Sequence, residues 1–284
     1  IVADALSAAK AAGTAYPAWS KTGPAERRGL LLKAADALEE MTPEIIQTMI
    51  TETGSTGPWA GFNCMLAGGM LREAASMTTQ ITGEIIPANK PGTLAMAQRK
   101  SLGVCLGIAP WNAPIILGVR AVAMAIACGN TAILKASELC PATHLAIGEA
   151  FRKAGFPDGV MNVVTNAPED AAEIVAALIA APEVRHINFT GSTSVGRIIA
   201  VKAAEQLKPV LLELGGKAPL IVLDDADLEA AVNGAAFGAF MNQGQICMST
   251  ERVIVHEGIA DAFIKAFAEK AKSLPAGNPR EQVV

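Results

Sequence analysis

Histidine is scarce in this sequence, with only His144, His186 and His256 among 284 residues. None of the three stands beside a cysteine together with a third residue that could orient it. This argues against a cofactor-independent thiol esterase or protease, which needs such a base. We expect His144 on a helix and His186 within a strand, and we interpret both as structural.

Paired cysteines are also missing. The five cysteines are an odd number, lie far apart and include no C-x-x-C pair. This usage argues against a disulfide framework and against a zinc site, so no metal is expected. It is typical of a reduced, cytoplasmic protein.

The chain has no excess of positive charge. Its 23 Lys and Arg residues against 27 Asp and Glu residues give a net charge of −4 at pH 7, so no nucleic-acid partner is expected. The first residues lack the basic and apolar regions of a signal peptide. Two long uncharged stretches, 101–119 and 230–250, contain amides with glycine or proline, which argues against a membrane span.

Hydrophobic residues are abundant, at 51% of the chain, which is enough for a large core. From about residue 102 onward, short apolar runs alternate with helical patterns. Strands with so little polar alternation are buried on both faces, as in parallel sheets. The repeated order of strand and helix therefore predicts an α/β fold with a doubly wound, Rossmann-like parallel sheet.

The sequence predicts three parts. Residues 1–78, which have helical patterns, join 103–215 in a nucleotide-binding domain. Residues 79–102 form an extended, hairpin-like arm that would serve in bridging or oligomerisation. Residues 216–284 begin a second α/β domain, because the double glycine Gly215-Gly216 breaks a strand there.

Polar clusters stand where predicted strands end, and ligands of open parallel sheets bind at those ends. In PWNAP, two prolines present the amide of Asn112, a neutral donor suited to an oxyanion. In LKASE, Lys135 and Glu138 could hold the hydroxyls of a ribose, and the carboxylate would repel the 2′-phosphate of NADP. The alternatives are a turn-stabilising asparagine and a glutamate that complements a helix dipole.

Two more clusters follow. In FTGSTSVGR, Gly191 and the N–H groups around Ser192 would form an anion site at a helix N-terminus, although an ordinary helix cap gives the same pattern. In LLELGGKAP, Glu213 lies within an apolar strand. A carboxylate there must be ion-paired, hydrogen-bonded or protonated more readily than usual. It suits a general base that activates water, with a structural ion pair as the alternative.

The segment NQGQICMST places Cys247 after a glycine and two amides. Gly244 lets the backbone approach a substrate closely. A free thiol has a pKa of ~8.5, so a nucleophilic cysteine needs a base or a lowered pKa. Glu213 is a better candidate for that base than any of the histidines.

In this order, PWNAP, LKASE, FTGSTSVGR, LELGGKAP and NQGQICMST resemble the aldehyde dehydrogenase superfamily along the whole chain. The stretches RKSLGVCLGIAPWNAPIILGVRAVAMAIACGN and GAFMNQGQICMSTERVIV are most similar to the bacterial group that oxidises salicylaldehyde, vanillin or benzaldehyde.

The resemblance implies NAD-dependent oxidation of an aromatic aldehyde to its carboxylic acid through a cysteine thiohemiacetal and a thioester. Cys247 would be the nucleophile, Asn112 with the Cys247 N–H would bind the oxyanion, and Glu213 would activate water. NADP is the less favoured cofactor. The implied NAD contacts are Trp111, Lys135, Glu138, Gly191, Ser192, Val195, Leu214 and Gly215.

This chain departs from the family pattern in three places. Ala113 and Ala136 replace a common aromatic residue and a common proline, and neither change removes a functional group. The chain also has no Glu-x-Phe-Gly-Pro stretch, which in the family holds the nicotinamide ribose. The resemblance therefore implies an internal fragment of a homodimeric or homotetrameric enzyme, with a truncated catalytic domain. A nucleotide-binding module without catalysis is the alternative.

Overall fold

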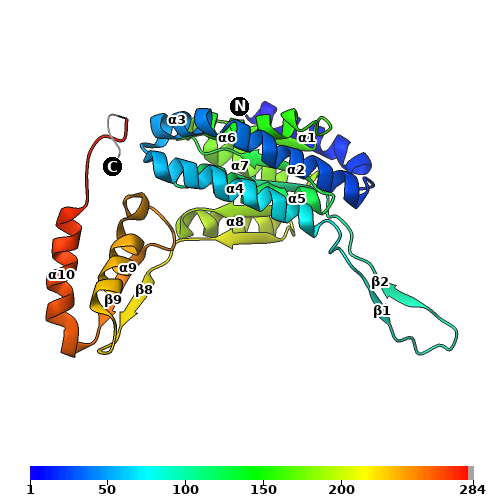
Figure 1. The fold of residues 1–284 in the computed structure, drawn as a ribbon. Coiled ribbons are helices and arrows are strands. Elements are labelled where there is room, and N and C mark those ends of the chain that lie inside the picture. The colour runs from blue at the N-terminus through cyan, green and yellow to red at the C-terminus, as the bar shows by residue number, and fades with distance from the viewer. Residues whose placement is uncertain (281–284) are drawn as a thin grey trace.

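The computed structural model describes residues 1–280 and contains a five-stranded parallel sheet in the order β5-β4-β3-β6-β7 (Figure 1). All residues of β3 and β4 are buried, as their unbroken apolar runs predict for central strands of a parallel sheet. The predicted doubly wound α/β fold is therefore confirmed. The strands are β3 (Val104–Ile108), β4 (Thr131–Lys135), β5 (Met161–Val164), β6 (Val184–Thr190) and β7 (Val210–Glu213).

The strand order reverses at β3. The chain adds β4 and β5 on one side of β3 and then returns to add β6 and β7 on the other. A crevice opens at such a switch point, between the carboxyl ends of β3 and β6, and it is the usual ligand site of these sheets. The strands end level there, since Ile108 pairs with both Lys135 and Phe189, and Thr190 pairs with Glu213.

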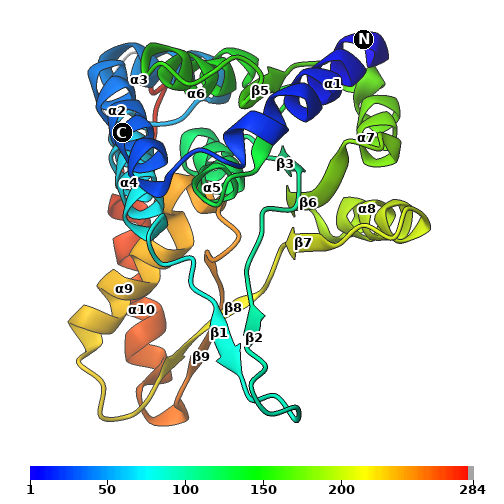
Figure 2. The ribbon, with the colours of Figure 1, turned by 90° about the vertical axis from the view of Figure 1, so that its right-hand side faces the viewer.

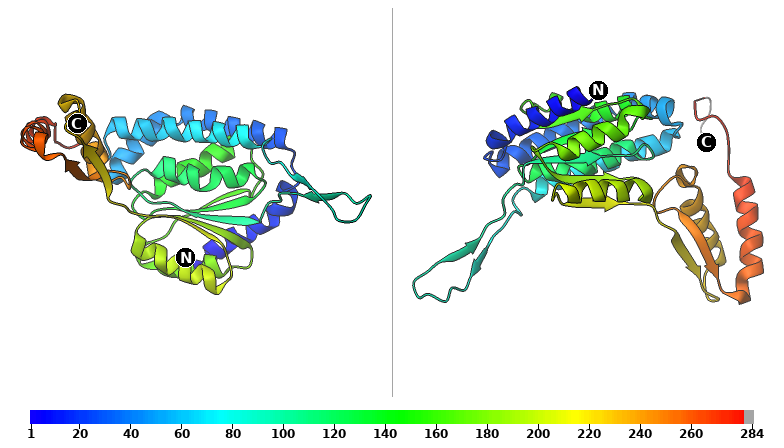
Figure 3. Two further views of the ribbon diagram at one scale, coloured as in Figure 1. Left: turned by 90° about the horizontal axis from the view of Figure 1, so that it is seen from below. Right: turned by 180° about the vertical axis from the view of Figure 1, so that it is seen from behind.

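Helices cover both faces of the sheet, as the left panel of Figure 3 shows. On one face lie α5 and α6, with α2, α3 and α4 packed outside them, and on the other lie α1, α7 and α8. Their bounds are α1 (Val2–Trp19), α2 (Pro24–Glu40), α3 (Thr42–Thr53), α4 (Gly57–Met77), α5 (Pro114–Ala127), α6 (Pro141–Lys153), α7 (Ala171–Ala180) and α8 (Thr193–Glu205).

Helix α5 lies unusually close to β3. A Cβ atom on Gly107 would come within 2.8 Å of the Cβ of Ala121, so only glycine allows this approach. The close packing fixes the short connection from β3 to α5, which carries Trp111 and Asn112.

Residues 79–102 contain the hairpin of β1 (Glu84–Ile86) and β2 (Ala95–Ala97), which pair in antiparallel fashion. The hairpin extends away from the sheet and its helices (Figure 2). It carries exposed apolar side chains, with Ile85 at 76% and Leu94 at 68% exposure.

The chain after β7 forms a smaller unit on the side of the sheet domain opposite the hairpin (Figure 1). It pairs β8 with β9 in parallel and has its own small core around Val222, Val232 and Phe263. No helix within residues 1–280 combines the length and the apolar character that crossing a lipid bilayer requires. The elements of this unit are β8 (Ala218–Val222), α9 (Leu228–Phe240), β9 (Thr250–Val255) and α10 (Ala260–Ser273).

Candidate active site

The loop that carries Cys247 begins with an unusual turn. After α9 ends at Phe240, Asn242, Gln243 and Gly244 all have left-handed backbone, with φ of 47°, 55° and 73°. This conformation costs a residue with a side chain roughly 1–2 kcal/mol. Strain of this kind is retained where the surrounding structure enforces it, often beside functional groups.

Asn112 holds this loop in place through two hydrogen bonds and is itself held by a third, from Trp59 on α4. Its side-chain amide donates to the carbonyl of Gln245 at 2.7 Å, and its own carbonyl accepts from Asn242 Nδ2 at 3.0 Å. The same carbonyl accepts from Trp59 Nε1 at 2.9 Å. The cysteine loop and the loop after β3 are therefore joined directly, although the sequence separates them by 130 residues.

Apolar contacts add to this attachment. Met241 and Ile246, on either side of the turn, pack against the main core of the sheet domain. The thiol of Cys247 is thus positioned by the sheet domain as well as by the unit to which its sequence neighbours belong.

Cys247 is the exposed cysteine among the five, all of which are free. Burial raises the pKa of Cys105 and of Cys140 to about 12, and it also raises the pKa values of Cys64 and Cys128. Those four thiols are held in the protonated, unreactive form. Cys247 is therefore the accessible thiol of the five, and we take it as the candidate nucleophile.

A cleft of about 340 Å³ lies between the ends of β3, β6 and β7 and the cysteine loop. It brings together the three side chains with proposed chemical roles, Cys247, Asn112 and Glu213. Six of its other lining residues are Trp111, Thr190, Gly191, Leu214, Gly215 and Ile246.

Glu213 is not buried, contrary to the sequence-based prediction. Glu213 is the last residue of β7, and its side chain is exposed rather than buried within an apolar strand. The reason is that β7 is an edge strand, so only one side of it is covered by the sheet. Glu213 therefore lines the cleft as an accessible group.

Lys135 and Glu138 form an ion pair just beyond the end of β4. Lys135 is nearly buried and Glu138 is partly buried. Burial alone would raise the pKa of Glu138, but hydrogen bonds from Lys135 and from Asn166 Nδ2, the latter at 3.0 Å, outweigh it and hold the pKa below its usual value. The Glu138 carboxylate is therefore charged at neutral pH.

The start of α8 has the cap predicted from the glycine–serine turn. Ser192 precedes the helix, and its hydroxyl accepts from the N–H of Val195 at 3.3 Å. Both side chains are exposed, and Ser192 lies directly after Gly191 at the cleft. The helix N-terminus is thus open to an anion at the edge of the switch-point crevice.

These groups fit a dinucleotide. A charged carboxylate and an ammonium group lie at one strand end and suit ribose hydroxyls, whereas a helix N-terminus follows β6 and suits phosphate. The side-chain oxygen of Asn166 is buried without a hydrogen-bond partner within residues 1–280, beside Glu138. An acceptor left unpaired there is suited to a ligand hydroxyl.

Sequence reasoning missed Trp59, Asn242, Gln245 and Asn166. Asn242 and Gln245 lie inside NQGQICMST, so their motif was recognised although their roles were not. Trp59 is on α4 and Asn166 follows β5, and neither belongs to a polar cluster that the sequence singles out. Their roles depend on tertiary contacts.

Comparison with known proteins gives a consistent result. Residues 2–284 match the family described as the aldehyde dehydrogenase family. The chain is 60% identical over 278 residues to a vanillin dehydrogenase of Pseudomonas fluorescens, covering 98% of this chain and 58% of that protein.

Two solved structures show the same relationship. A salicylaldehyde dehydrogenase from Pseudomonas putida G7, complexed with salicylaldehyde, is similar with a TM-score of 0.97 at 53% identity, covering 99% of this chain and 58% of that one. An NAD-dependent benzaldehyde dehydrogenase from Corynebacterium glutamicum has a TM-score of 0.93 at 41% identity, covering 98% and 59%. The chain thus spans somewhat more than half the length of these relatives, and it belongs to the aldehyde dehydrogenase family.

Proposed function

We propose that the complete protein containing these residues oxidises an aromatic aldehyde to its carboxylic acid with NAD as the electron acceptor. The observation that carries the proposal is the single cleft lined by Cys247, Asn112 and Glu213. A nucleophile, an oxyanion donor and a base are the three protein groups that this reaction requires.

In the first step, the exposed Cys247 thiol gives its proton to solvent, and the resulting thiolate attacks the aldehyde carbon and forms a thiohemiacetal. The carbonyl oxygen gains negative charge, and the Asn112 amide with the backbone N–H of Cys247 would stabilise it. That N–H finds no acceptor among the described residues, so it is available. The Asn112 amide exchanges its bond to the Gln245 carbonyl for one to the oxyanion.

Bound NAD would supply the acceptor for the hydride that leaves the thiohemiacetal carbon. A thioester on Cys247 remains. Glu213 then takes a proton from water, and the resulting nucleophile releases the carboxylic acid and restores the thiol. The exposure of Glu213 suits this role, because water must reach it.

For the cofactor, we assign Lys135 and Glu138 to the adenosine ribose and the region of Gly191, Ser192 and Val195 to the pyrophosphate. Trp111, Leu214 and Gly215 would line the path of the nucleotide toward the cleft. NAD is preferred to NADP because the charged carboxylate of Glu138 repels a 2′-phosphate.

The aromatic substrate class is supported by the names of the relatives and by the apolar residues beside the thiol. Ile246 lines the cleft, and Met248 is 76% exposed next to Cys247. Comparing kcat/KM for salicylaldehyde, vanillin, benzaldehyde and an aliphatic aldehyde tests it. A clear preference for the aliphatic compound would reject this substrate class.

We further propose that the protein is a cytoplasmic homodimer or homotetramer. Five free cysteines favour a reducing compartment. The β1–β2 hairpin, part of residues 79–102, extends Ile85 and Leu94 into solvent, and such apolar side chains suit contact with a second copy. The residues 1–78 with 103–215 would bind NAD, and 216–284 would contribute to the catalytic domain.

The decisive experiment follows NADH absorbance when the complete protein is mixed with NAD and benzaldehyde. We expect Cys247→Ala to abolish turnover, whereas Cys128→Ala, which replaces a half-buried cysteine elsewhere, should retain it. Turnover by Cys247→Ala would reject the nucleophile. Ester cleavage without NAD would instead favour a thiol esterase, and NAD binding without any turnover by the unaltered protein would favour a nucleotide-binding module.

A further inference from the structure

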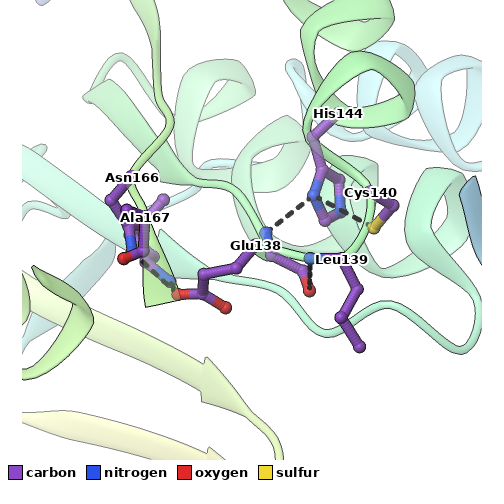
Figure 4. A network of polar contacts seen from close by, with 8 residues as sticks. Glu138, Leu139, Cys140, His144, Asn166 and Ala167 are labelled. Atoms are coloured by element: carbon purple, nitrogen blue, oxygen red, sulfur yellow. Dashed lines mark hydrogen bonds and ion pairs between the residues drawn. The ribbon is translucent and has the colours of Figure 1, made fainter. Parts of the chain in front are cut away.

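The reaction proposed above assigns no role to His144. It lies in the first turns of α6, with 0% of its surface exposed. Its Nδ1 atom is 3.0 Å from the backbone nitrogen of Ser137, and its Nε2 atom is 3.1 Å from the carbonyl oxygen of Pro114. Figure 4 shows the ring beside Cys140, next to the turn that carries Glu138.

These two partners determine which nitrogen of the ring carries the proton. The backbone N–H of Ser137 can only donate, so Nδ1 must accept. The carbonyl of Pro114 can only accept, so Nε2 must carry hydrogen. His144 is therefore neutral, with its proton on Nε2. A charged ring would lose the bond to Ser137, because both nitrogens would then be donors.

Each bond reaches a different part of the proposed site. Ser137 lies between Lys135 and Glu138, the pair assigned to the ribose. Pro114 begins α5, two residues after Asn112, whose amide is assigned to the oxyanion. One buried ring thus connects the loop after β4 with the loop after β3.

The ring itself is held rigidly. A Cβ on Gly118 of α5 would come within 3.2 Å of the His144 ring, so α5 packs directly against it. The N-terminus of α6 is fixed from outside by Glu52 of α3, whose carboxylate accepts from the N–H groups of Ala142 and Thr143, both at 2.9 Å. A ring held between α5 and the fixed start of α6 can transmit position from one loop to the other.

We propose that His144 is a positioning residue that sets the loop of Lys135 and Glu138 and the loop of Asn112 at their working separation. This inference rests on the proposed function, because the spacing of the two loops matters only if NAD and the oxyanion donor must reach the same substrate.

The charges around the ring are consistent with a link that is neutral near pH 7. Lys135 and Glu138 face it from β4 and the turn beyond, and their effects on it oppose each other. Burial lowers the pKa of His144 to about 4, so both hydrogen bonds persist throughout the neutral range.

Two substitutions can separate the two bonds. In His144→Asn, the side-chain oxygen lies near the place of Nδ1 and can accept from Ser137, but nothing reaches Pro114. In His144→Gln, the side-chain amide reaches the place of Nε2 and can donate to Pro114, but the acceptor for Ser137 is displaced. His144→Leu removes both bonds and serves as the double-loss control.

The readouts in the complete protein are the Kd for NAD and the first-turnover rate of NADH formation at saturating NAD. We expect His144→Asn to lower the first-turnover rate about tenfold while the Kd changes less than about twofold. We expect His144→Gln to raise the Kd about tenfold with the rate nearly kept. His144→Leu should show both losses.

A second readout needs no cofactor. The ¹⁵N signals of the His144 ring can be assigned because they disappear in His144→Gln, and their chemical shifts should place the His144 proton on Nε2. A proton on Nδ1 would overturn the proposal. The proposal would also be overturned if His144→Asn and His144→Gln each changed both the Kd for NAD and the first-turnover rate, in proportion to a loss of thermal stability. If the unaltered protein neither binds NAD nor forms NADH, the proposed function is rejected, and the role of His144 is rejected with it.

Discussion

The side-chain amide of Asn112 donates a hydrogen bond of 2.7 Å to the backbone carbonyl of Gln245, two residues before Cys247. The bond joins the loop after β3 to the loop of the thiol. It means that the proposed oxyanion donor already points toward the nucleophile's loop before any substrate enters. To bind the oxyanion, the Asn112 amide only has to release the Gln245 carbonyl, and no large movement is needed.

Replacement of this amide tests its role. We expect Asn112→Ala to lower kcat by about 100- to 1,000-fold, the loss typical of a single oxyanion donor. The control is Asn233→Ala, an exposed amide on α9 outside the cleft, which should leave kcat unchanged. A fall of less than about threefold in Asn112→Ala would assign the oxyanion to other donors.

Glu213→Gln separates the two halves of the reaction. The first turnover should still produce NADH, because attack and hydride loss precede the need for activated water. Subsequent turnovers should slow by about 100-fold or more, since the thioester persists. Rapid-mixing measurements of NADH would show a burst and then a slow phase. Glu205→Gln, at the exposed end of α8, should show no burst. Equal slowing of both phases in Glu213→Gln would contradict the role as water base.

Glu138→Gln tests cofactor choice. Loss of the charge removes the repulsion of a 2′-phosphate, so the preference for NAD over NADP, measured as the ratio of kcat/KM values, should fall on the order of tenfold. Glu149→Gln removes a carboxylate from the exposed face of α6 and should leave the ratio unchanged. An unchanged ratio in Glu138→Gln would mean that another group rejects NADP.

Glu52→Gln tests how α6 is held. Helix α6 has no side-chain cap of its own, and the Glu52 carboxylate supplies one from α3. The charge also complements the positive end of the helix dipole. We expect a loss of about 1 kcal/mol in the free energy of unfolding by urea. Glu73→Gln, exposed on α4, is the matched control. Equal stability of the two variants would show that Glu52 does not serve as the cap.

The buried histidine predicts an acid-sensitive stability. The pKa of His144 falls from 6.5 in the unfolded chain to about 4 in the folded one, because burial opposes the charge. The unfolded state therefore binds the proton first, and stability from this group is full above pH 6.5 and is lost as the pH falls toward 4. Between pH 7 and pH 5, the unaltered protein should lose about 2 kcal/mol more than His144→Gln. Parallel losses in the two proteins would contradict this account.

The sequence predicts the fold and the strand-end clusters because both depend on local patterns. Unbroken apolar runs indicate buried parallel strands, and the order of strands and helices then places Asn112, Lys135, Ser192 and Glu213 at one edge of the sheet. It does not reveal that β7 is an edge strand, since that depends on strand order. This is why Glu213 was expected to be buried and is exposed.

The same distinction applies to the contacts that fix the cysteine loop. Trp59 and Asn242 meet at one carbonyl of Asn112, from segments that lie on opposite sides of it in the chain. No periodicity or short motif in the sequence indicates that these two side chains donate to the same carbonyl. Likewise, His144 is correctly placed on a helix from its sequence, but its two backbone partners follow from the packing of α5 against α6.

Met241 and Ile246 belong by sequence to the smaller unit, yet they rest on the core of the larger one. A displacement of α9 and α10 would therefore have to break the contacts of these two side chains before it could move the Cys247 sulfur away from Asn112.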